Sequence, residues 1–392
     1  MRKLRYLSLL LAAMLFKGCG APERGNKRIV VENTLDRDRS LETVSVELSL
    51  LGLLEPEGEL SIVDADTGKP LVSQVVDGNG DGTGDTVLFQ PEIKANSEQV
   101  FEVKVRDAVM EVDGDPTCYS RFVPERTDDY AWENDRVAFR TYGPTAQKMV
   151  EDGIQGGTLS SGMDAWLKRV KYPIINKWYK KELETDGSYH EDTGEGVDNF
   201  HVGASRGVGG IAVKADTVYH FSKNFVQWKN YDNGPLRTSF SLTYADWDAA
   251  GKKISETKYI SLDRGSHLSR FEIGISGVDM FSTGLTLHEK DGAIGVSPDQ
   301  GWISYWEPHE DSELGTGIVV PNGQMTGHDH YITDAKDKSN LFAHIKTTKG
   351  KAVYYAGFGW KKSGQFNTKE QWEAYLEKFA EQLDNPLVVK VQ

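Results

Sequence analysis

A glycine-rich segment between Gly187 and Gly210 carries the side chains best suited to chemistry. It reads GSYHEDTGEGVDNFHVGASRGVGG and holds two of the nine histidines of the chain. Imidazoles exchange protons near neutral pH and a guanidinium binds carboxylates, so His190, His201 and Arg206 are candidates for a catalytic site. The alternative is a surface crossover whose histidines make only local hydrogen bonds. The polar groups taken as a set favour the site.

A second candidate lies on a short alternating stretch, residues 136–142. Val137 and Phe139 fall on one face of this predicted strand, and Arg140 and Tyr142 fall on the other. If the apolar face is buried, Arg140 and Tyr142 are expected to line a cleft.

Residues 165–181 read AWLKRVKYPIINKWYKK and combine basic with aromatic side chains, without any acid. Flat rings stack on the apolar faces of sugars, and cations bind carboxylate or sulfate. This pattern predicts that Lys177, Trp178, Lys180 and Lys181 bind an acidic sugar. The alternative is a solvated basic face whose aromatic residues point into the core.

Two histidines of the segment GHDHY, His328 and His330, project from one face if the segment is extended, which suits a shared anion or a shared metal ion. With His190 or His201 they would form a three-nitrogen site for zinc or manganese. The sequence requires no cofactor, so a divalent metal ion here is a hypothesis.

The segment DGNGDGTGD resembles the start of a calcium loop, with ligands at Asp77, Asn79, Asp81 and Asp85. Position twelve of such a loop would be Leu88, where a glutamate belongs, and the flanking residues are typical of strands. A glycine-rich hairpin is the favoured interpretation, and structural calcium is the alternative.

Two other classes of partner are not favoured. The chain contains no phosphate-binding G-x-x-x-x-G-K-[ST], and the net charge of −14 argues against a nucleic-acid partner. Paired carboxylates for glycoside hydrolysis stay open, with Glu133, Glu191 and Glu195 as candidates.

The N-terminal residues predict export. Basic side chains precede an apolar run and then Gly18-Cys19, so residues 1–19 are expected to be a signal peptide, and Cys19 a lipidation site of the bacterial lipoprotein type. The expected location is the periplasm or the outer membrane, with membrane contact only through the lipid anchor. Cys118 then has no disulfide partner.

Period-two alternation dominates the remaining chain and predicts an all-β fold. Residues 28–112 are expected to form a small antiparallel β-sandwich, and residues 117–392 a large antiparallel sandwich that carries the active site. One C-terminal helix is predicted from a Thr368–Gln371 capping box and from apolar residues at helical spacing up to Pro386.

The blocks YHEDTGEGVDNFHVGASRGVGG, GPLRTSFSLTYADWD, GWISYWEP and YYAGFGWKKSGQF resemble a family of exported bacterial proteins of formerly unknown function. The family is common in polysaccharide-utilisation loci of marine Bacteroidetes, and its characterised member is an ulvan oligosaccharide dehydratase. The strand-rich second half is also similar to the mutarotase-type super-sandwich of several polysaccharide lyases.

This resemblance implies the removal of water from a terminal glucuronic or iduronic acid on a sulfated oligosaccharide, beside other glycan-degrading enzymes. The product would be a 4,5-unsaturated uronic acid. The reaction needs a cation on the substrate carboxylate, a base for the C5 proton and an acid for the C4 hydroxyl.

From residue chemistry, Arg206 is expected to bind the carboxylate, with Arg140 in reserve. The base is His190 or His201, and the acid is Tyr142 or Tyr189. The alternatives are a polysaccharide lyase and a non-catalytic glycan-binding lipoprotein, in which Trp178, Trp306 and Trp360 would stack on sugars.

Overall fold

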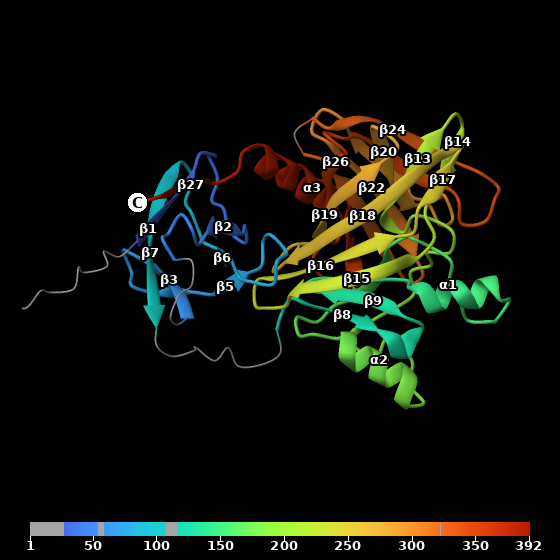
Figure 1. The fold of residues 1–392 in the computed structure, drawn as a ribbon, viewed down its shortest axis with the longest axis horizontal. Helices are drawn as coiled ribbons and strands as arrows, with labels where there is room; N and C mark the ends of the chain where they lie inside the picture. The colour runs from blue at the N-terminus through green and yellow to red at the C-terminus, as the bar shows by residue number, and fades with distance from the viewer. Residues whose placement is uncertain (1–26, 54–58, 107–115, 322) are drawn as a thin grey trace, which may run out of the picture.

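The computed structural model describes residues 27–53, 59–106, 116–321 and 323–392. The predicted signal peptide and Cys19 lie outside these residues. The chain forms a small and a larger assembly of antiparallel sheets with a helix near the C-terminus, so the predicted all-β architecture is confirmed (Figure 1).

The small sandwich consists of β1 (Lys27–Asn33), β2 (Val44–Glu47), β3 (Glu59–Asp64), β4 (Pro70–Leu71), β5 (Ser73–Val76), β6 (Thr86–Phe89), β7 (Ser97–Arg106) and β27 (Val388–Val391). One of its sheets has the strand order β27-β1-β7-β3-β4 and the other β2-β6-β5. Apolar residues at alternate positions, such as Ile29, Val31 and Phe101, are buried between them.

The last strand of the small sandwich comes from the far end of the chain. β27 pairs with β1 in antiparallel register, with Ile29 opposite Val391 and Glu32 opposite Val388. The predicted large domain, 117–392, therefore includes a strand that lies in the small sandwich. Backbone hydrogen bonds to β27 complete the edge of β1. The local sequence of β27 does not indicate which sheet it joins, so this pairing was not predicted.

Among the described residues, the larger part of the chain forms three antiparallel sheets. The main sheet contains β15 (Phe225–Asp232), β16 (Arg237–Tyr244), β17 (Trp247–Ala249), β18 (Lys252–Asp263), β19 (Leu268–Ser276), β21 (Ala293–Ser297), β22 (Trp302–His309), β23 (Ser312–Val319) and β26 (Lys351–Trp360). The facing sheet contains β13 (Val208–Ala215), β14 (Val218–His220), β20 (Met280–Thr286), β24 (Met325–Tyr331) and β25 (Asn340–Lys346). The short sheet contains β8 (Tyr119–Val123), β9 (Asp129–Glu133), β10 (Ala138–Thr141), β11 (Asp164–Lys168) and β12 (Gly196–Val197).

One apolar core joins these three sheets. It includes Phe139 from the short sheet, Ile211 from the facing sheet, and Phe271 and Phe358 from the main sheet, all with at most 1% of their surface exposed. This burial fixes which face of each strand points inward, and so fixes the direction of the polar side chains on the opposite faces.

The predicted C-terminal helix is α3 (Lys369–Asp384). The Thr368 hydroxyl accepts a hydrogen bond from the Gln371 amide, and the Gln371 side chain accepts one from the Asn367 amide. α3 packs on β22 and β23, where Trp372 donates a hydrogen bond to the Thr316 carbonyl. A side chain at Gly315 would lie 2.7 Å from Trp372, so glycine makes this close approach possible.

Two further helices were not predicted. α1 (Pro144–Glu151) begins directly after Gly143, and α2 (Ile175–Glu184) packs on the outer face of the short sheet, below β8 and β9 in Figure 1. Two short 3₁₀ turns, η1 (Pro124–Arg126) and η2 (Lys361–Ser363), complete the described elements. No helix within the described ranges is long and apolar enough to span a bilayer.

Candidate functional site

Four of the candidate residues meet around one cavity, here called the histidine cavity. Its volume is about 450 Å³. Its lining comes from three separated segments and comprises Arg140, Tyr142, Gly157, Thr158, Leu159, His190, Asp198, Asn199, Phe200, His201, Val202 and Gly203. The structure thus brings together Arg140, Tyr142, His190 and His201, which lie up to about 60 residues apart in the sequence.

Strand register places the guanidinium of the cavity beside an acid. Arg140 on β10 pairs directly with Asp164 on β11. Cross-strand partners have neighbouring side chains, and the Asp164 carboxylate accepts hydrogen bonds from Arg140 Nη2 at 2.6 Å and Nε at 2.9 Å. Arg140 is 7% exposed and Asp164 is fully buried.

Two more buried carboxylates surround Arg140. Asp198, which follows β12, lies 2.9 Å from Arg140 Nη2, and Asp129 on β9 lies 3.9 Å from Nη1. Three buried acids share this guanidinium, with Arg126 as a further cation nearby. We call Asp129, Arg140, Asp164 and Asp198 the acid cluster.

Burial favours the protonated form of the three acids in the cluster. Burial raises the pKa of Asp164 to about 7 and that of Asp129 to about 6, and it also raises the pKa of Asp198. Arg140 opposes these shifts by stabilising the ionised carboxylates, while repulsion between Asp164 and Asp198 adds to the rise for Asp164. The arrangement provides a buried carboxylic acid that can give and take a proton.

We expect Asp164 to make stability depend on pH. Its pKa is raised from 3.8 to about 7, so the folded protein keeps a proton that the unfolded chain releases above about pH 4. This stabilising contribution is complete below about pH 4 and is lost as the pH rises through 7, at up to about 1.4 kcal/mol per pH unit. Urea unfolding of native protein and Asp164→Asn between about pH 4 and about pH 8 tests this. An equally steep pH dependence in the variant would contradict it.

Aromatic rings enclose the guanidinium. Arg140 lies 5.1 to 5.7 Å from the ring centres of Tyr142, Trp166 and Tyr189. The Tyr142 hydroxyl donates a hydrogen bond to Asp164 at 3.3 Å, and burial raises its pKa well above the usual range, so the phenol stays protonated. Tyr142 lines the cavity, whereas Tyr189 is 1% exposed and binds Arg140 and Arg126 through its hydroxyl. Tyr189 is therefore a support for Arg140 and is not placed to protonate a substrate.

His190 has a defined tautomer. Its Nδ1 lies 2.5 Å from the backbone carbonyl of Asp198. A carbonyl only accepts, so Nδ1 carries the proton and Nε2 keeps its lone pair when the ring is neutral. The side chain is 54% exposed, which leaves Nε2 free to meet a substrate at the cavity rim.

His201 also lines the cavity and is held by residues that do not line it. Its Nε2 lies 3.0 Å from the Asp337 carboxylate, and its backbone carbonyl accepts from His288. The side chain is 60% exposed. His190 and His201 therefore line the same cavity with different partners.

Arg206 does not line the cavity, contrary to the sequence-based assignment. It is 1% exposed, its guanidinium stacks on Phe221 at 3.8 Å, and its Nη1 donates to the Ser161 hydroxyl at 2.9 Å. Burial lowers its pKa to about 10. A substrate carboxylate cannot reach this position, because the surrounding core excludes it. Arg140 is the arginine at the cavity.

The predicted sugar-binding surface on residues 165–181 divides into two faces. Lys177 and Lys180 are exposed on α2 and Lys181 is half-buried, while Trp178 is buried beneath them. Lys177 pairs with Glu195, and Lys181 donates to the Glu191 carbonyl. None of these residues lines the histidine cavity.

The predicted stacking platform is wrong. Trp178, Trp306 and Trp360 are 2%, 6% and 3% exposed, because each packs into an apolar cluster. Side chains this deeply buried offer no face to a sugar.

The three acids considered for glycoside hydrolysis are also separated from the cavity. Glu133 is fully buried, pairs with Lys168 at 2.6 Å and accepts hydrogen bonds from the Ile174 and Ile175 amides at the start of α2. Glu191 is exposed, and Glu195 binds Lys177. Neither Glu133, Glu191 nor Glu195 lines the cavity.

The structure does not bring together the ligands of either metal site considered from the sequence. His328 and His330 are exposed on β24, and His190 and His201 are held by other partners. In the glycine-rich hairpin, the Asp77 carboxylate accepts from the Gly80 and Gly82 amides, and Asp85 accepts from Gly78. Within the described ranges, neither these histidines nor the carboxylates of Asp77, Asp81 and Asp85 form a group of three ligand atoms close enough for one ion.

The structure adds residues that the sequence did not single out. Asp164 and Asp198 complete the acid cluster, and a group formed by His288, Glu307 and His309 lies behind the cavity wall. Phe200, which lines the cavity, packs against His288 and His309. Asp198 lies between the candidates His190 and His201 in the sequence, so its position could have suggested a role in the site. Nothing in the local sequence marks Asp164, because its contact with Arg140 depends on strand register.

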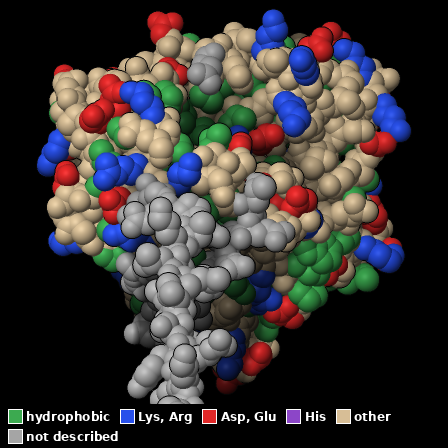
Figure 2. All heavy atoms as spheres, turned by 60° about the vertical axis from the view of Figure 1, so that its left-hand side comes forward, with side chains coloured by type: hydrophobic (Ala, Val, Ile, Leu, Met, Phe, Trp, Pro, Cys, Tyr) green, Lys and Arg blue, Asp and Glu red, His purple; other side chains and the backbone are tan. Residues whose placement is uncertain are grey.

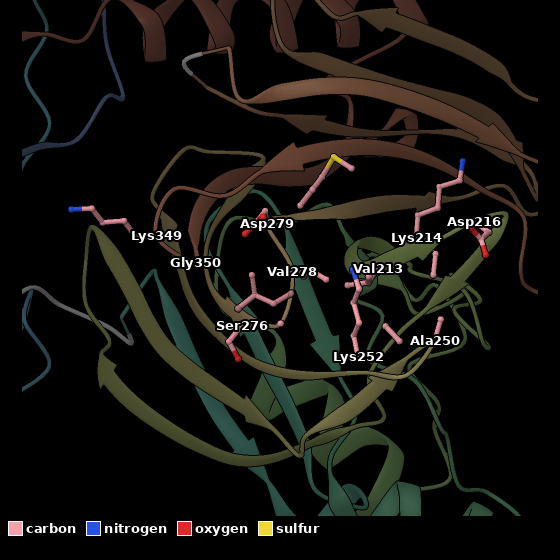
Figure 3. Close-up of a pocket in the computed structure, with 15 residues that line it drawn as sticks. Val213, Lys214, Asp216, Ala250, Lys252, Ser276, Val278, Asp279, Lys349 and Gly350 are labelled. Carbon is pink, nitrogen blue, oxygen red and sulfur yellow. The ribbon is translucent and has the colours of Figure 1, made fainter.

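Another hollow, of about 910 Å³, lies where β13 meets the turns around Gly277 and Gly350. Its labelled lysines point in different directions, and Lys349 extends away from Lys214 (Figure 3). Its lining contains no histidine, arginine or tyrosine. Where the grey atoms leave the surface visible in Figure 2, Lys and Arg side chains are interspersed with Asp and Glu. The histidine cavity remains the strongest candidate.

Fold and site together define an all-β sandwich protein with a cavity that combines a buried acid cluster with two histidines. A family model described as "Domain of unknown function (DUF4861)" matches residues 31–389, and the chain belongs to this family. It is 54% identical to "Uncharacterized protein P7" of Formosa agariphila, over the whole length of both chains.

Two solved structures from Enterococcus faecalis also align with the chain. One is a protein in glycosyl hydrolase family 38, with a TM-score of 0.49 and 11% identity, covering 95% of this chain and 48% of that one. The other is an alpha-mannosidase, with a TM-score of 0.45 and 12% identity, covering 95% and 46%. The chain thus spans about half the length of these proteins.

Proposed function

We propose that the protein is a dehydratase that removes water from the non-reducing-end uronic acid of sulfated, ulvan-type oligosaccharides. The observation that carries the proposal is the convergence of Arg140, Tyr142 and His190 on one cavity. A cation, a protonated acid and a base are the three groups that this elimination needs. The resemblance of the sequence blocks to a family with a dehydratase member supplies the substrate class.

Arg140 is assigned to the substrate carboxylate. The C5 proton becomes acidic when the charge of that carboxylate is neutralised, because negative charge grows there as the proton leaves. Arg140 is held in place by Asp164, Asp198 and Tyr189. A guanidinium fixed before the substrate arrives needs no reorganisation during the reaction.

His190 is assigned as the base and Tyr142 as the acid. His190 Nε2 takes the proton from C5, and the electrons of that C–H bond form the C4=C5 double bond. The C4–O bond breaks, and the leaving hydroxide takes a proton from Tyr142 and departs as water. Asp164 in its protonated form, in contact with the Tyr142 oxygen, then gives a proton to the phenolate. His190 releases the C5 proton to solvent, and the site is restored when Asp164 regains a proton.

Oligosaccharides that end in a saturated uronic acid on rhamnose-3-sulfate provide the test. Purified protein is expected to produce the absorbance of a conjugated unsaturated acid, with the loss of one water in the product mass and no change in chain length. Rapid shortening of long ulvan chains would indicate a polysaccharide lyase instead. Binding without new absorbance over a long incubation would indicate a glycan-binding protein, and either result would overturn the proposal.

A further inference from the structure

Three side chains behind the histidine cavity have the composition of a transition-metal site. His288 follows β20, while Glu307 and His309 lie two residues apart on β22 and so share a face of the strand. Their ligand atoms all lie within 4.8 Å of one another. This group is separate from the acid cluster and from Arg140, Tyr142 and His190.

The contact between His288 and Glu307 requires a proton or a cation between the two groups. His288 Nε2 lies 3.0 Å from the His201 carbonyl, which only accepts, so Nε2 carries a proton. His288 Nδ1 lies 2.5 Å from Glu307 Oε1. A neutral ring beside an ionised carboxylate would set two lone pairs against each other, which is repulsive. Either a proton shared by His288 and Glu307 holds this contact, or the two groups move apart around a metal ion.

Glu307 provides an independent sign of a ligand. The residue is 1% exposed, and its Oε2 has no hydrogen-bond partner among the described residues. A buried carboxylate oxygen without a partner is costly, and coordination to a cation removes that cost. His309 completes the group and contacts the Asn199 side chain through Nε2 at 3.1 Å.

We propose that His288, Glu307 and His309 bind a divalent transition-metal ion. Two imidazoles with one carboxylate suit zinc and its neighbours, whereas calcium and magnesium prefer oxygen ligands alone. The hydrogen bond from His288 to a backbone carbonyl is the usual support of a metal-bound histidine. Ligands about 2.1 Å from zinc lie about 3.4 Å apart, so side-chain rotations of roughly an ångström complete the site.

The ion would fix the wall of the cavity. Asn199 and His201 both line the cavity, and each contacts one of the two histidine ligands. Metal binding therefore ties the segment 198–203 to β22. This inference does not rest on the proposed dehydratase activity, and its readouts do not include it.

Metal binding to the full chain tests the proposal directly. Protein stripped with a chelator is titrated with Zn²⁺ by calorimetry, and Co²⁺ loading is followed by visible absorption. We expect one ion per chain, and a loss of affinity on the order of 100-fold or more in Glu307→Gln and in His309→Ala. His328→Ala, which removes an exposed histidine on β24, is expected to bind as the native protein does.

Three outcomes would overturn the proposal. In the first, the native chain binds no stoichiometric Zn²⁺ or Co²⁺, which would mean that a proton holds the His288–Glu307 contact. In the second, His328→Ala weakens binding as much as Glu307→Gln does, which would mean that surface histidines hold the metal. Circular dichroism of each variant separates the loss of a ligand from unfolding, and a folded Glu307→Gln variant with native affinity also contradicts the site.

Discussion

Replacing Arg140 with methionine is expected to abolish dehydratase activity and to lower the free energy of unfolding by about 3–5 kcal/mol at neutral pH. Methionine keeps much of the volume but removes the charge shared by Asp129, Asp164 and Asp198. Three buried carboxylates would then lack their central cation. Urea unfolding gives the stability, and absorbance of the unsaturated product gives the activity.

A double variant separates the two effects of Arg140. Adding Asp164→Asn to Arg140→Met removes one buried carboxyl group and its repulsion with Asp198, so part of the stability is expected to return. Activity is not expected to return, because the substrate carboxylate still lacks its cation. If Arg140→Met alone is as stable as the native protein, Arg140 does not offset the cost of burying the three carboxylates.

Replacing His190 with glutamine is expected to lower kcat by about 10²- to 10⁴-fold, the usual effect of losing a general base. Glutamine can still donate a hydrogen bond to the Asp198 carbonyl, and the half-exposed side chain contributes little to the core. Stability is therefore expected to change by less than about 0.5 kcal/mol. Steady-state kinetics with the uronate-ended oligosaccharide measures the effect.

The matched control is His220→Gln on β14, which makes the same chemical change outside the cavity lining. It is expected to keep native kinetics. If His190→Gln remains fully active, His190 is not the base. If His220→Gln loses as much activity as His190→Gln, the effect does not come from the cavity.

Local patterns were sufficient for part of this structure. Alternation in residues 136–142 predicts a strand with Arg140 facing away from Phe139, and these side chains do point to opposite sides of β10. The Thr368–Gln371 capping box predicts α3, because its hydrogen bonds join residues close in the sequence. Both features need no information from distant segments.

The features that were not predicted depend on contacts between segments far apart in the sequence. α2 begins where Glu133, 41 residues earlier, binds its first amides, so its start carries no local capping signal. Arg206 and Trp178 look like exposed binding residues by type, but their burial depends on Phe221 and Trp166, which lie in other segments of the chain. Glu307 and His309 show a two-residue spacing on a strand, yet nothing near them points to His288.

The pairing of β27 with β1 also constrains the order of folding. The sheet that contains the first described strand lacks one edge until residues 388–391 have been synthesised, by which time the strands of the larger assembly already exist. The small sandwich is therefore completed last, although most of its sequence comes first. Its last strand, β27, can pair with β1 only after all the residues between them have been made.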